Sequence, residues 1–185
     1  MDQKWTIPGT TLEGLRGDAD RTDGLFQSLF LAGGLTLSQV SSVTGLEAYT
    51  IQNWVKRGYL SPPRNKRYDM EQVCRIIIIN MLKGALPLEK ICSLMQYING
   101  DLTDESDDII DDAVLYFMFV KLAARARHIG GEVAWDEALE QATASYAEPY
   151  PGARERVTKV LQTMLMAWIA SRFRQQVDEM ADSLK

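Results

Sequence analysis

One stretch of the chain carries side chains whose chemistry suits contact with a nucleic acid. Hydroxyl, amide and basic groups are spaced along residues 47–57, and a basic loop follows at residues 64–68. Glutamine and asparagine amides can pair with adenine edges, while arginine and lysine bind guanine or phosphate. These residue types point to recognition of duplex DNA. The candidate set comprises Thr50, Gln52, Asn53, Lys56, Arg57, Arg64, Lys66, Arg67 and Tyr68.

The spacing of apolar residues predicts that residues 47–57 form a helix with one polar face. Ala48, Ile51 and Val55 follow i, i+3, i+7 spacing and should face inward. This leaves the amides of Gln52 and Asn53 on or near the outer side, together with Thr50 and Lys56. Trp54 has two readings: it anchors the following loop to the helix, which we favour, or it stacks on the nucleic acid.

A second short helix is expected just before this one. Thr36 or Ser38 can cap it, Leu37, Val40 and Val43 mark its inner side, and Gly45 ends it. Two short helices joined by a tight glycine turn, the second with an amide-rich outer face, form a helix-turn-helix pattern.

The segment after Gly58 cannot continue the helix, because Pro62 and Pro63 interrupt it. Residues 64–67 then form a basic loop, which Tyr68 closes. A basic loop beside a recognition helix acts as a wing that binds the phosphates flanking the groove. The alternative to phosphate binding is that this loop is simply a charged surface loop in contact with solvent.

The distribution of charge supports a localised basic module. The whole chain of 185 residues has a net charge of −5, but residues 36–98 hold eight basic and four acidic residues. That region is therefore net positive, whereas residues 99–185 are strongly acidic. A basic module within an acidic chain is a physical indication of an anionic partner.

Composition indicates the general class of protein. A hydrophobic fraction of 46% and a charged fraction of 24% are typical of a soluble globular chain. Four charges within residues 109–126 argue against a membrane span, and the N-terminal residues lack a signal-peptide pattern. We expect a cytoplasmic protein with no membrane association.

Nothing in the sequence predicts an enzyme. No nucleophile–base pair, metal cluster or phosphate-binding glycine loop appears, so we predict no catalytic residue, no metal site and no cofactor. Cys74 and Cys92 fall on apolar helix faces and are interpreted as small core residues.

The remaining helices follow from apolar periodicity. Ile76–Ile79 is β-branched and could be a strand, but the i, i+3, i+4, i+7 spacing around it favours a helix. The expected helices cover residues 22–30, 69–83, 88–98, 109–128, 134–147 and 154–183. The predicted domains are an N-terminal arm with a short helix (1–35), the DNA-binding domain (36–98), an acidic linker (99–108) and a helical region (109–185).

Three segments resemble one known family. TLSQVSSVTGLEAYTIQNWVKRGYL is similar to the helix-turn-helix of the MerR family of bacterial transcription regulators, including an uncharacterised MerR-like branch of small proteins. SPPRNKRY resembles the wing of that family, and YDMEQVCRIIIINMLKGALPLEKICSLM resembles its following helix pair. Gln52-Asn53-Trp54 stands where the family usually carries Arg-Tyr-Tyr.

The resemblance implies a mainly α fold, with a MerR-like winged helix-turn-helix domain followed by an all-helical C-terminal region. It further implies a sequence-specific transcriptional regulator acting as a homodimer through residues 109–185. Its recognition helix would lie in the major groove, and the wing would lie on phosphates. The aromatic and Met residues near 109–120 and 164–168 have two interpretations. The preferred one is that they form the core or a dimer interface, and the other is that they line a pocket for an unknown effector. The alternative function is a non-enzymatic adaptor that keeps the fold without reading DNA.

Overall fold

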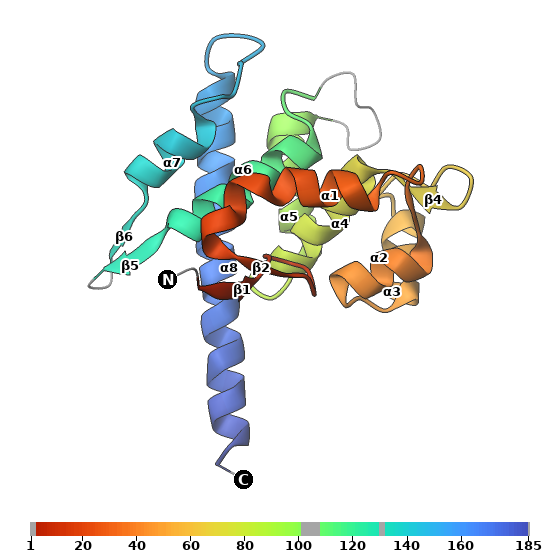
Figure 1. Cartoon of the computed structure of the whole chain (residues 1–185), viewed down its shortest axis with the longest axis horizontal. Coiled ribbons are helices and arrows are strands. Elements are labelled where there is room, and N and C mark those ends of the chain that lie inside the picture. The colour runs from red at the N-terminus through yellow and green to blue at the C-terminus, as the bar shows by residue number, and fades with distance from the viewer. Residues whose placement is uncertain (1–2, 101–107, 130–131, 185) are drawn as a thin grey trace.

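The structure is a computed structural model that describes residues 3–100, 108–129 and 132–184. It is mainly helical, with short paired strands (Figure 1). Within the described residues the helices are α1 (Thr22–Leu29), α2 (Leu37–Thr44), α3 (Ala48–Lys56), α4 (Met70–Leu82), α5 (Leu88–Asn99), α6 (Asp112–Arg125), α7 (Asp136–Thr143) and α8 (Ala153–Asp182). A helix is found in each expected region, but two are shorter than predicted: residues 127 and 128 belong to β5 and Ala134 to β6, so α6 and α7 do not fill the ranges 109–128 and 134–147. None of these helices is long and apolar enough to cross a membrane.

The strands are very short and were not predicted. They form three antiparallel pairs: β1 (Lys4–Thr6) with β2 (Glu13–Leu15), β3 (Leu35–Thr36) with β4 (Arg67–Tyr68), and β5 (Arg127–Ile129) with β6 (Glu132–Ala134). A 3-10 helix, η1 (Arg16–Arg21), joins β2 to α1. Two or three residues are too few for the alternation of side chains that identifies a strand in sequence.

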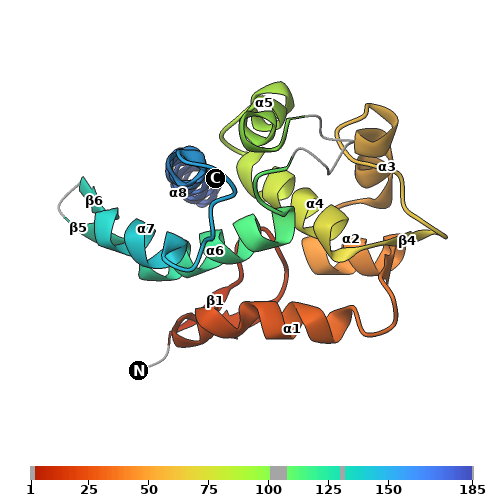
Figure 2. The same ribbon diagram turned by 90° about the horizontal axis from the view of Figure 1, so that it is seen from above.

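Helix α4 lies at the centre of the molecule. The four consecutive isoleucines Ile76–Ile79 are all buried, because α2, α5, α6 and α8 pack around this helix (Figure 2). Its N-terminus is closed by a capping box, in which the Asp69 side chain accepts from the Gln72 amide and the Gln72 side chain accepts from the Asp69 amide. The preference for helix over strand at the isoleucines is therefore confirmed.

The N-terminal segment, which was predicted to be an arm, packs tightly against the helices. The hydroxyl of Tyr116, on α6, donates to the carbonyl of Pro8 at 2.9 Å, and the Asn80 side chain donates to the carbonyl of Gly9 at 3.0 Å. Gly9 has a φ of 74°, and a Cβ there would lie 2.7 Å from the carbonyl oxygen of Ile77. Only glycine permits this approach of the loop to α4.

Polar contacts join α6 to the helices that precede it. Arg75 forms a buried ion pair with Asp112 at the start of α6, and the amide of Ala113 donates to the carboxylate of Glu71 at 2.8 Å. Asn99 is buried and donates to the carbonyl of Ile110. Residues 101–107 of the expected acidic linker lie outside the described residues. The boundaries drawn at 98 and 109 remain a prediction.

The pKa of Glu71 is raised to about 7. Burial is the main cause, the amide of Ala113 opposes it, and the carboxylates of Asp111, Asp112 and Asp69 add to it. The folded state therefore holds this proton more tightly than the unfolded chain, whose glutamate titrates near 4.5. It follows that this group loses its stabilising effect as the pH rises from about 4.5 to 7.

We predict that Glu71→Gln flattens this part of the pH dependence. The free energy of unfolding of the variant should rise relative to that of the natural protein between pH 5 and pH 7.5. The difference in free energy of unfolding between the two proteins should change by less than the ~1.4 kcal/mol per pH unit expected for one fully coupled proton, because Glu71 is partly solvated. Urea unfolding across this range measures it, with the exposed Glu13→Gln as control. If the free energies of unfolding of Glu71→Gln and the natural protein changed in parallel with pH, the raised pKa of Glu71 would be contradicted.

Candidate nucleic-acid interface

Helices α2 and α3 are joined by a turn that the local sequence specifies. Thr36 and Gln39 form a capping box at the start of α2. Gly45 ends that helix in the left-handed conformation with a φ of 70°, as the glycine signal predicted. Leu46 is buried behind the turn. The relative position of the two short helices is thus fixed by backbone caps and one apolar contact.

Helix α3 has a buried face and an exposed face. Ile51 and Trp54 are buried, which places Trp54 in the core and disfavours the alternative of stacking on a nucleic acid. On the opposite side Gln52, Asn53 and Lys56 are exposed, and Thr50 is half-buried at the margin.

The exposed face also holds Tyr49, which the sequence reasoning missed. Its side chain is 71% exposed, an unusual position for a large aromatic group. Residues 49, 52, 53 and 56 follow i, i+3, i+4, i+7 spacing, so they form one stripe along α3. That spacing is present in the sequence, but the apolar face of the helix does not by itself single out the tyrosine. We define Tyr49, Gln52, Asn53 and Lys56 as the α3 stripe.

The basic loop ends in a tight turn. The amide of Arg67 donates to the carbonyl of Arg64 at 2.9 Å, and the two residues between them have positive φ, 51° at Asn65 and 61° at Lys66. This is the pattern of a type I′ turn, which connects twisted antiparallel strands. Arg64 and Lys66 are exposed on it. The turn projects from β4 at the end of the molecule farthest from α7 (Figure 1).

Buried polar contacts hold the base of this loop. The side-chain amide of Gln72 donates to the carbonyl of Ser61 at 3.1 Å, to its hydroxyl at 2.9 Å and to the carbonyl of Pro62 at 3.0 Å. The guanidinium of Arg67 donates to the carbonyl of Gly34 at 2.7 Å. The capping residue of α4 therefore also fixes the chain between α3 and the turn.

Besides Arg67, two further residues of the candidate set are committed to contacts within the protein. Tyr68 is 2% exposed, and burial raises the pKa of its phenol, so its side chain belongs to the core and cannot reach a ligand at the surface. This corrects its assignment as a contact residue: the β3–β4 pairing turns it inward. Arg57 lies 3.1 Å from the carboxylate of Glu89 and over the ring of Tyr59, so its charge is partly neutralised.

The structure therefore brings together a smaller set than the sequence suggested. Gln52, Asn53 and Lys56 lie on one face of α3, and Arg64 and Lys66 lie on the turn. Thr50 and Arg67 are half-buried beside them.

The cysteines do not lie at this surface, and the described residues provide no metal-binding group. Cys74 and Cys92 are free thiols buried in the core, as predicted, and burial raises the pKa of both. Among the described residues no group of three His, Cys, Asp or Glu side chains could hold a metal ion.

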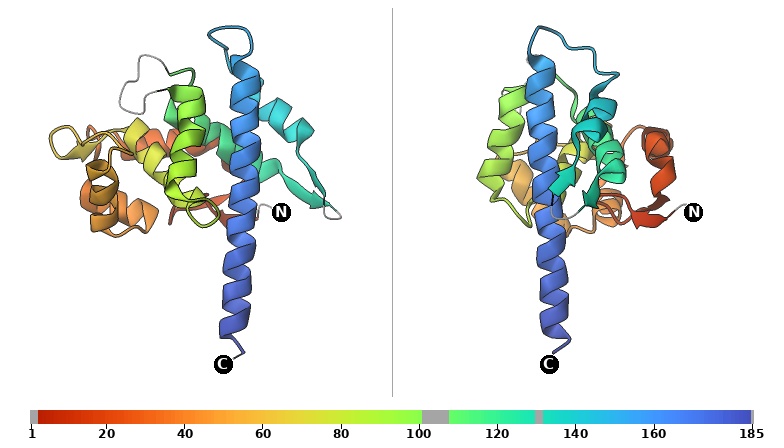
Figure 3. Two further views of the ribbon diagram at one scale, coloured as in Figure 1. Left: turned by 180° about the vertical axis from the view of Figure 1, so that it is seen from behind. Right: turned by 90° about the vertical axis from the view of Figure 1, so that its left-hand side faces the viewer.

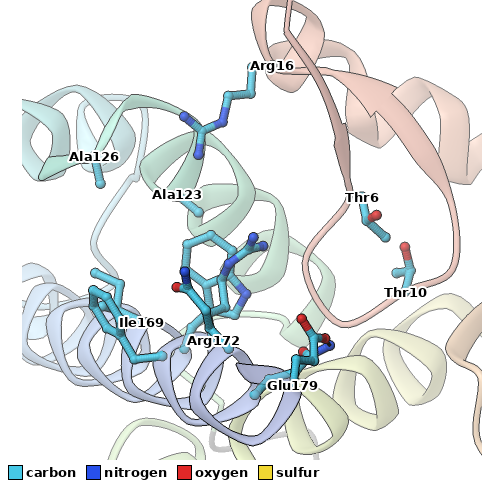
Figure 4. Close-up of a pocket in the computed structure, with 12 residues that line it drawn as sticks. Thr6, Thr10, Arg16, Ala123, Ala126, Ile169, Arg172 and Glu179 are labelled. Atoms are coloured by element: carbon cyan, nitrogen blue, oxygen red, sulfur yellow. Dashed lines mark hydrogen bonds between the residues drawn. The ribbon is translucent and has the colours of Figure 1, made fainter. Parts of the chain in front are cut away.

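A cleft of about 830 Å³ lies elsewhere, between the N-terminal hairpin and α8. Arg16 and Arg172 reach into it from opposite sides, with Thr6 and Thr10 along its far wall (Figure 4). The guanidinium of Arg172 lies 5.2 Å from the ring centroid of Trp168. Of the two segments considered for an effector, 164–168 contributes Trp168 to this cleft, and none of the residues lining the cleft comes from 109–120.

Comparison with known proteins finds a family model that matches part of the chain. Residues 33–119 match a family described as Domain of unknown function (DUF1836). This range includes α2 to α5 and the first part of α6, so it continues past the expected domain boundary. An uncharacterized protein, YkrK, from Bacillus subtilis (strain 168) is 31% identical over 84 residues, which cover 43% of this chain and 36% of that relative. The chain thus spans about a third of that relative's length. No solved structure gives a significant match.

The expected membership of the MerR family is wrong. Residues 33–119 match the DUF1836 family instead, and the relative is an uncharacterized protein. The physical reason is that the motifs were local. A capped short helix, a glycine turn and a second amphipathic helix serve many small helical domains. The departure at Gln52-Asn53-Trp54 and the packing of α6 on α4 distinguish this chain.

Substitutions at Lys66 test the turn itself. A left-handed conformation costs an L-residue about 1–2 kcal/mol, and Asn-Gly is the preferred pair for a type I′ turn. We predict that Lys66→Gly raises the free energy of unfolding by up to about 1 kcal/mol, and that the β-branched Lys66→Val lowers it by about 1–2 kcal/mol. Denaturant unfolding of both variants provides the measurement. Equal stabilities would show that residues 64–67 do not form this turn.

Proposed function

We propose that this chain is a sequence-specific DNA-binding transcriptional regulator that acts as a dimer. In this proposal α2 and α3 form a helix-turn-helix, α3 enters the major groove, and the turn at residues 64–67 acts as a wing on the flanking phosphates. The observation that carries the proposal is the α3 stripe, an exposed row of hydrogen-bonding side chains on a helix that is anchored from behind by Ile51 and Trp54.

The dimensions and chemistry of α3 support this reading. An α-helix with its side chains is about 10–12 Å in diameter, which fits a major groove about 12 Å wide, and the nine residues of α3 give it a length of about 13 Å along the groove. Gln52 and Asn53 supply amides that can read adenine, and Tyr49 supplies a planar face for a sugar or base edge. Lys56, Arg64 and Lys66 then supply charge for phosphates on either side.

The dimer in this proposal uses residues 109–185. A dimer with two-fold symmetry binds two half-sites, so it recognises a longer DNA sequence than one short helix can recognise alone. The cleft between the N-terminal hairpin and α8 supports an effector site, and the guanidinium groups of Arg16 and Arg172 suit an anionic ligand.

An adaptor that binds another protein is the second candidate. Two observations favour it: Glu89 neutralises Arg57 beside α3, and Tyr49 is an exposed aromatic group of the kind enriched in protein interfaces. The acidic residues 99–185 also disfavour a second contact with DNA. The two candidates differ in how binding responds to salt.

The test removes the three exposed cations. Binding of duplex DNA releases about 0.9 counterion per neutralised phosphate, so each cation contributes to the slope of log affinity against log salt. We predict that Lys56→Ala, Arg64→Ala and Lys66→Ala together weaken binding to all duplexes and reduce this slope by roughly 2–3 units. Fluorescence anisotropy across a salt series measures both quantities.

A matched triple variant controls for net charge. Lys4→Ala, Arg21→Ala and Lys159→Ala also remove three exposed cations, but from β1, η1 and α8. This variant should keep the slope and affinity of the natural protein. An equal loss in both triples, or no binding of duplex DNA by the natural protein, would reject the interface and leave the adaptor.

A further inference from the structure

The cleft of about 830 Å³ separates the N-terminal hairpin from α8. Helix α8 runs past the hairpin and extends beyond the rest of the molecule (Figure 3). The walls of the cleft come from β1 and the loop after it, the start of η1, the end of α6 and the part of α8 between Trp168 and Glu179 (Figure 4). This volume lies in the range of pockets that bind small organic molecules.

Two arginines present guanidinium groups to the cleft, and each is held on an indole ring. The guanidinium carbon of Arg16 lies 5.5 Å from the ring centroid of Trp5, and that of Arg172 lies 5.2 Å from the centroid of Trp168. A guanidinium stacked in this way keeps the N–H donors at its edge available for an acidic group. Neither arginine forms an ion pair with a carboxylate in the part of the chain that the structure describes.

The charges that line the cleft leave an excess of positive charge. Glu179 is the acidic residue among the described lining residues. It follows Arg172 by about two helical turns, and its carboxylate accepts from the side-chain amide of Gln175 at 2.9 Å. The cleft thus has two cations and one anion. A ligand with an acidic group would complete this balance through charge-assisted hydrogen bonds.

The cleft also has an apolar wall. Ala123 and Ala126 contribute to it from α6, and Trp168, Ile169 and Phe173 contribute from α8. An inorganic anion would leave this wall in contact with water. A ligand with a flat apolar body would cover the wall and gain the free energy of apolar burial.

We propose that this cleft binds an organic acid with an aromatic body, such as an aromatic carboxylate. The acidic group pairs with the guanidinium groups of Arg16 and Arg172, and the rings pack on the apolar wall. This gives the ligand class of the effector site in the proposed function. It rests on that proposal for its regulatory role, but not for its physical basis.

The far wall of the cleft is attached to the helix pair α2–α3. Thr6 and Thr10 form this wall, and the next residue, Thr11, donates its amide to the carbonyl of Val43 at 2.8 Å. The Thr11 hydroxyl donates to the carbonyl of Ser42 at 2.6 Å. Both carbonyls belong to the last turn of α2, directly before the turn into α3. A ligand that orders this wall therefore stabilises the α2–α3 pair against local opening.

The first experiment measures ligand binding by the full chain through fluorescence titration. The probe is 8-anilinonaphthalene-1-sulfonate, and N-phenyl-1-naphthylamine carries the same rings without the acid. The natural protein should bind the sulfonate at least about tenfold more tightly than the amine. The aromatic acid 2-naphthoate should displace the sulfonate, and inorganic phosphate at the same concentration should not.

Substitutions then test the two arginines. Arg16→Met and Arg172→Met keep an apolar stem but lose the guanidinium, so each should weaken sulfonate binding by about fivefold or more and change amine binding by less than about twofold. The controls Arg21→Met and Lys159→Met remove exposed cations from η1 and α8 outside the cleft and should bind both probes as the natural protein does. Circular dichroism verifies that all four variants are folded.

Three results would each overturn the ligand assignment. They are equal affinity of the natural protein for the two probes, displacement of the sulfonate by phosphate, and equal losses of sulfonate binding in the cleft variants and the control variants.

The second experiment measures the attachment of the cleft to α2–α3. Amide hydrogen exchange over residues 37–56 should slow when the sulfonate saturates the protein, and exchange over residues 136–143 of α7, which do not line the cleft, should stay the same. Unchanged exchange over residues 37–56 would overturn the coupling. Neither experiment uses DNA, so the failure of this inference and the failure of DNA binding are distinguishable.

Discussion

The complete burial of α4 is the constraint on which the rest of the structure depends. Ten of its thirteen residues are buried, so it has no solvent face and must be surrounded. Helix α2 packs against it, α6 and α8 pack along it, and the loop at Gly9 reaches it through the one residue type that fits. Arg75 and Glu71 then join the same helix to the start of α6. The chain that leads from α3 to the turn is attached to this central helix through the side chain of Gln72.

The sequence predicted the helices because each is long enough to show periodicity. It did not predict the strands, since two or three residues form a pair only when distant segments meet, as Leu35 meets Tyr68. The packing of the N-terminal segment was not predicted either, because it also depends on contacts between distant segments. Its hydroxyl contact from Tyr116 to Pro8 spans 108 residues, and its composition alone resembles a loose chain.

The candidate site was predicted in part. The outward position of Gln52, Asn53 and Lys56 follows from helix geometry, and their exposure agrees. The burial of Tyr68 and the pairing of Arg57 with Glu89 depend on tertiary contacts that no local pattern contains. The family resemblance failed because local motifs recur across unrelated small domains.

Selection of bound sequences from a random pool of duplex DNA tests the central claim most directly. The claim that α3 reads base edges in a dimer predicts enrichment of a motif with two-fold symmetry, and the motif should weaken or change when Asn53 is replaced by alanine. A pool that shows no enrichment over many rounds would contradict the claim that this surface recognises DNA sequence.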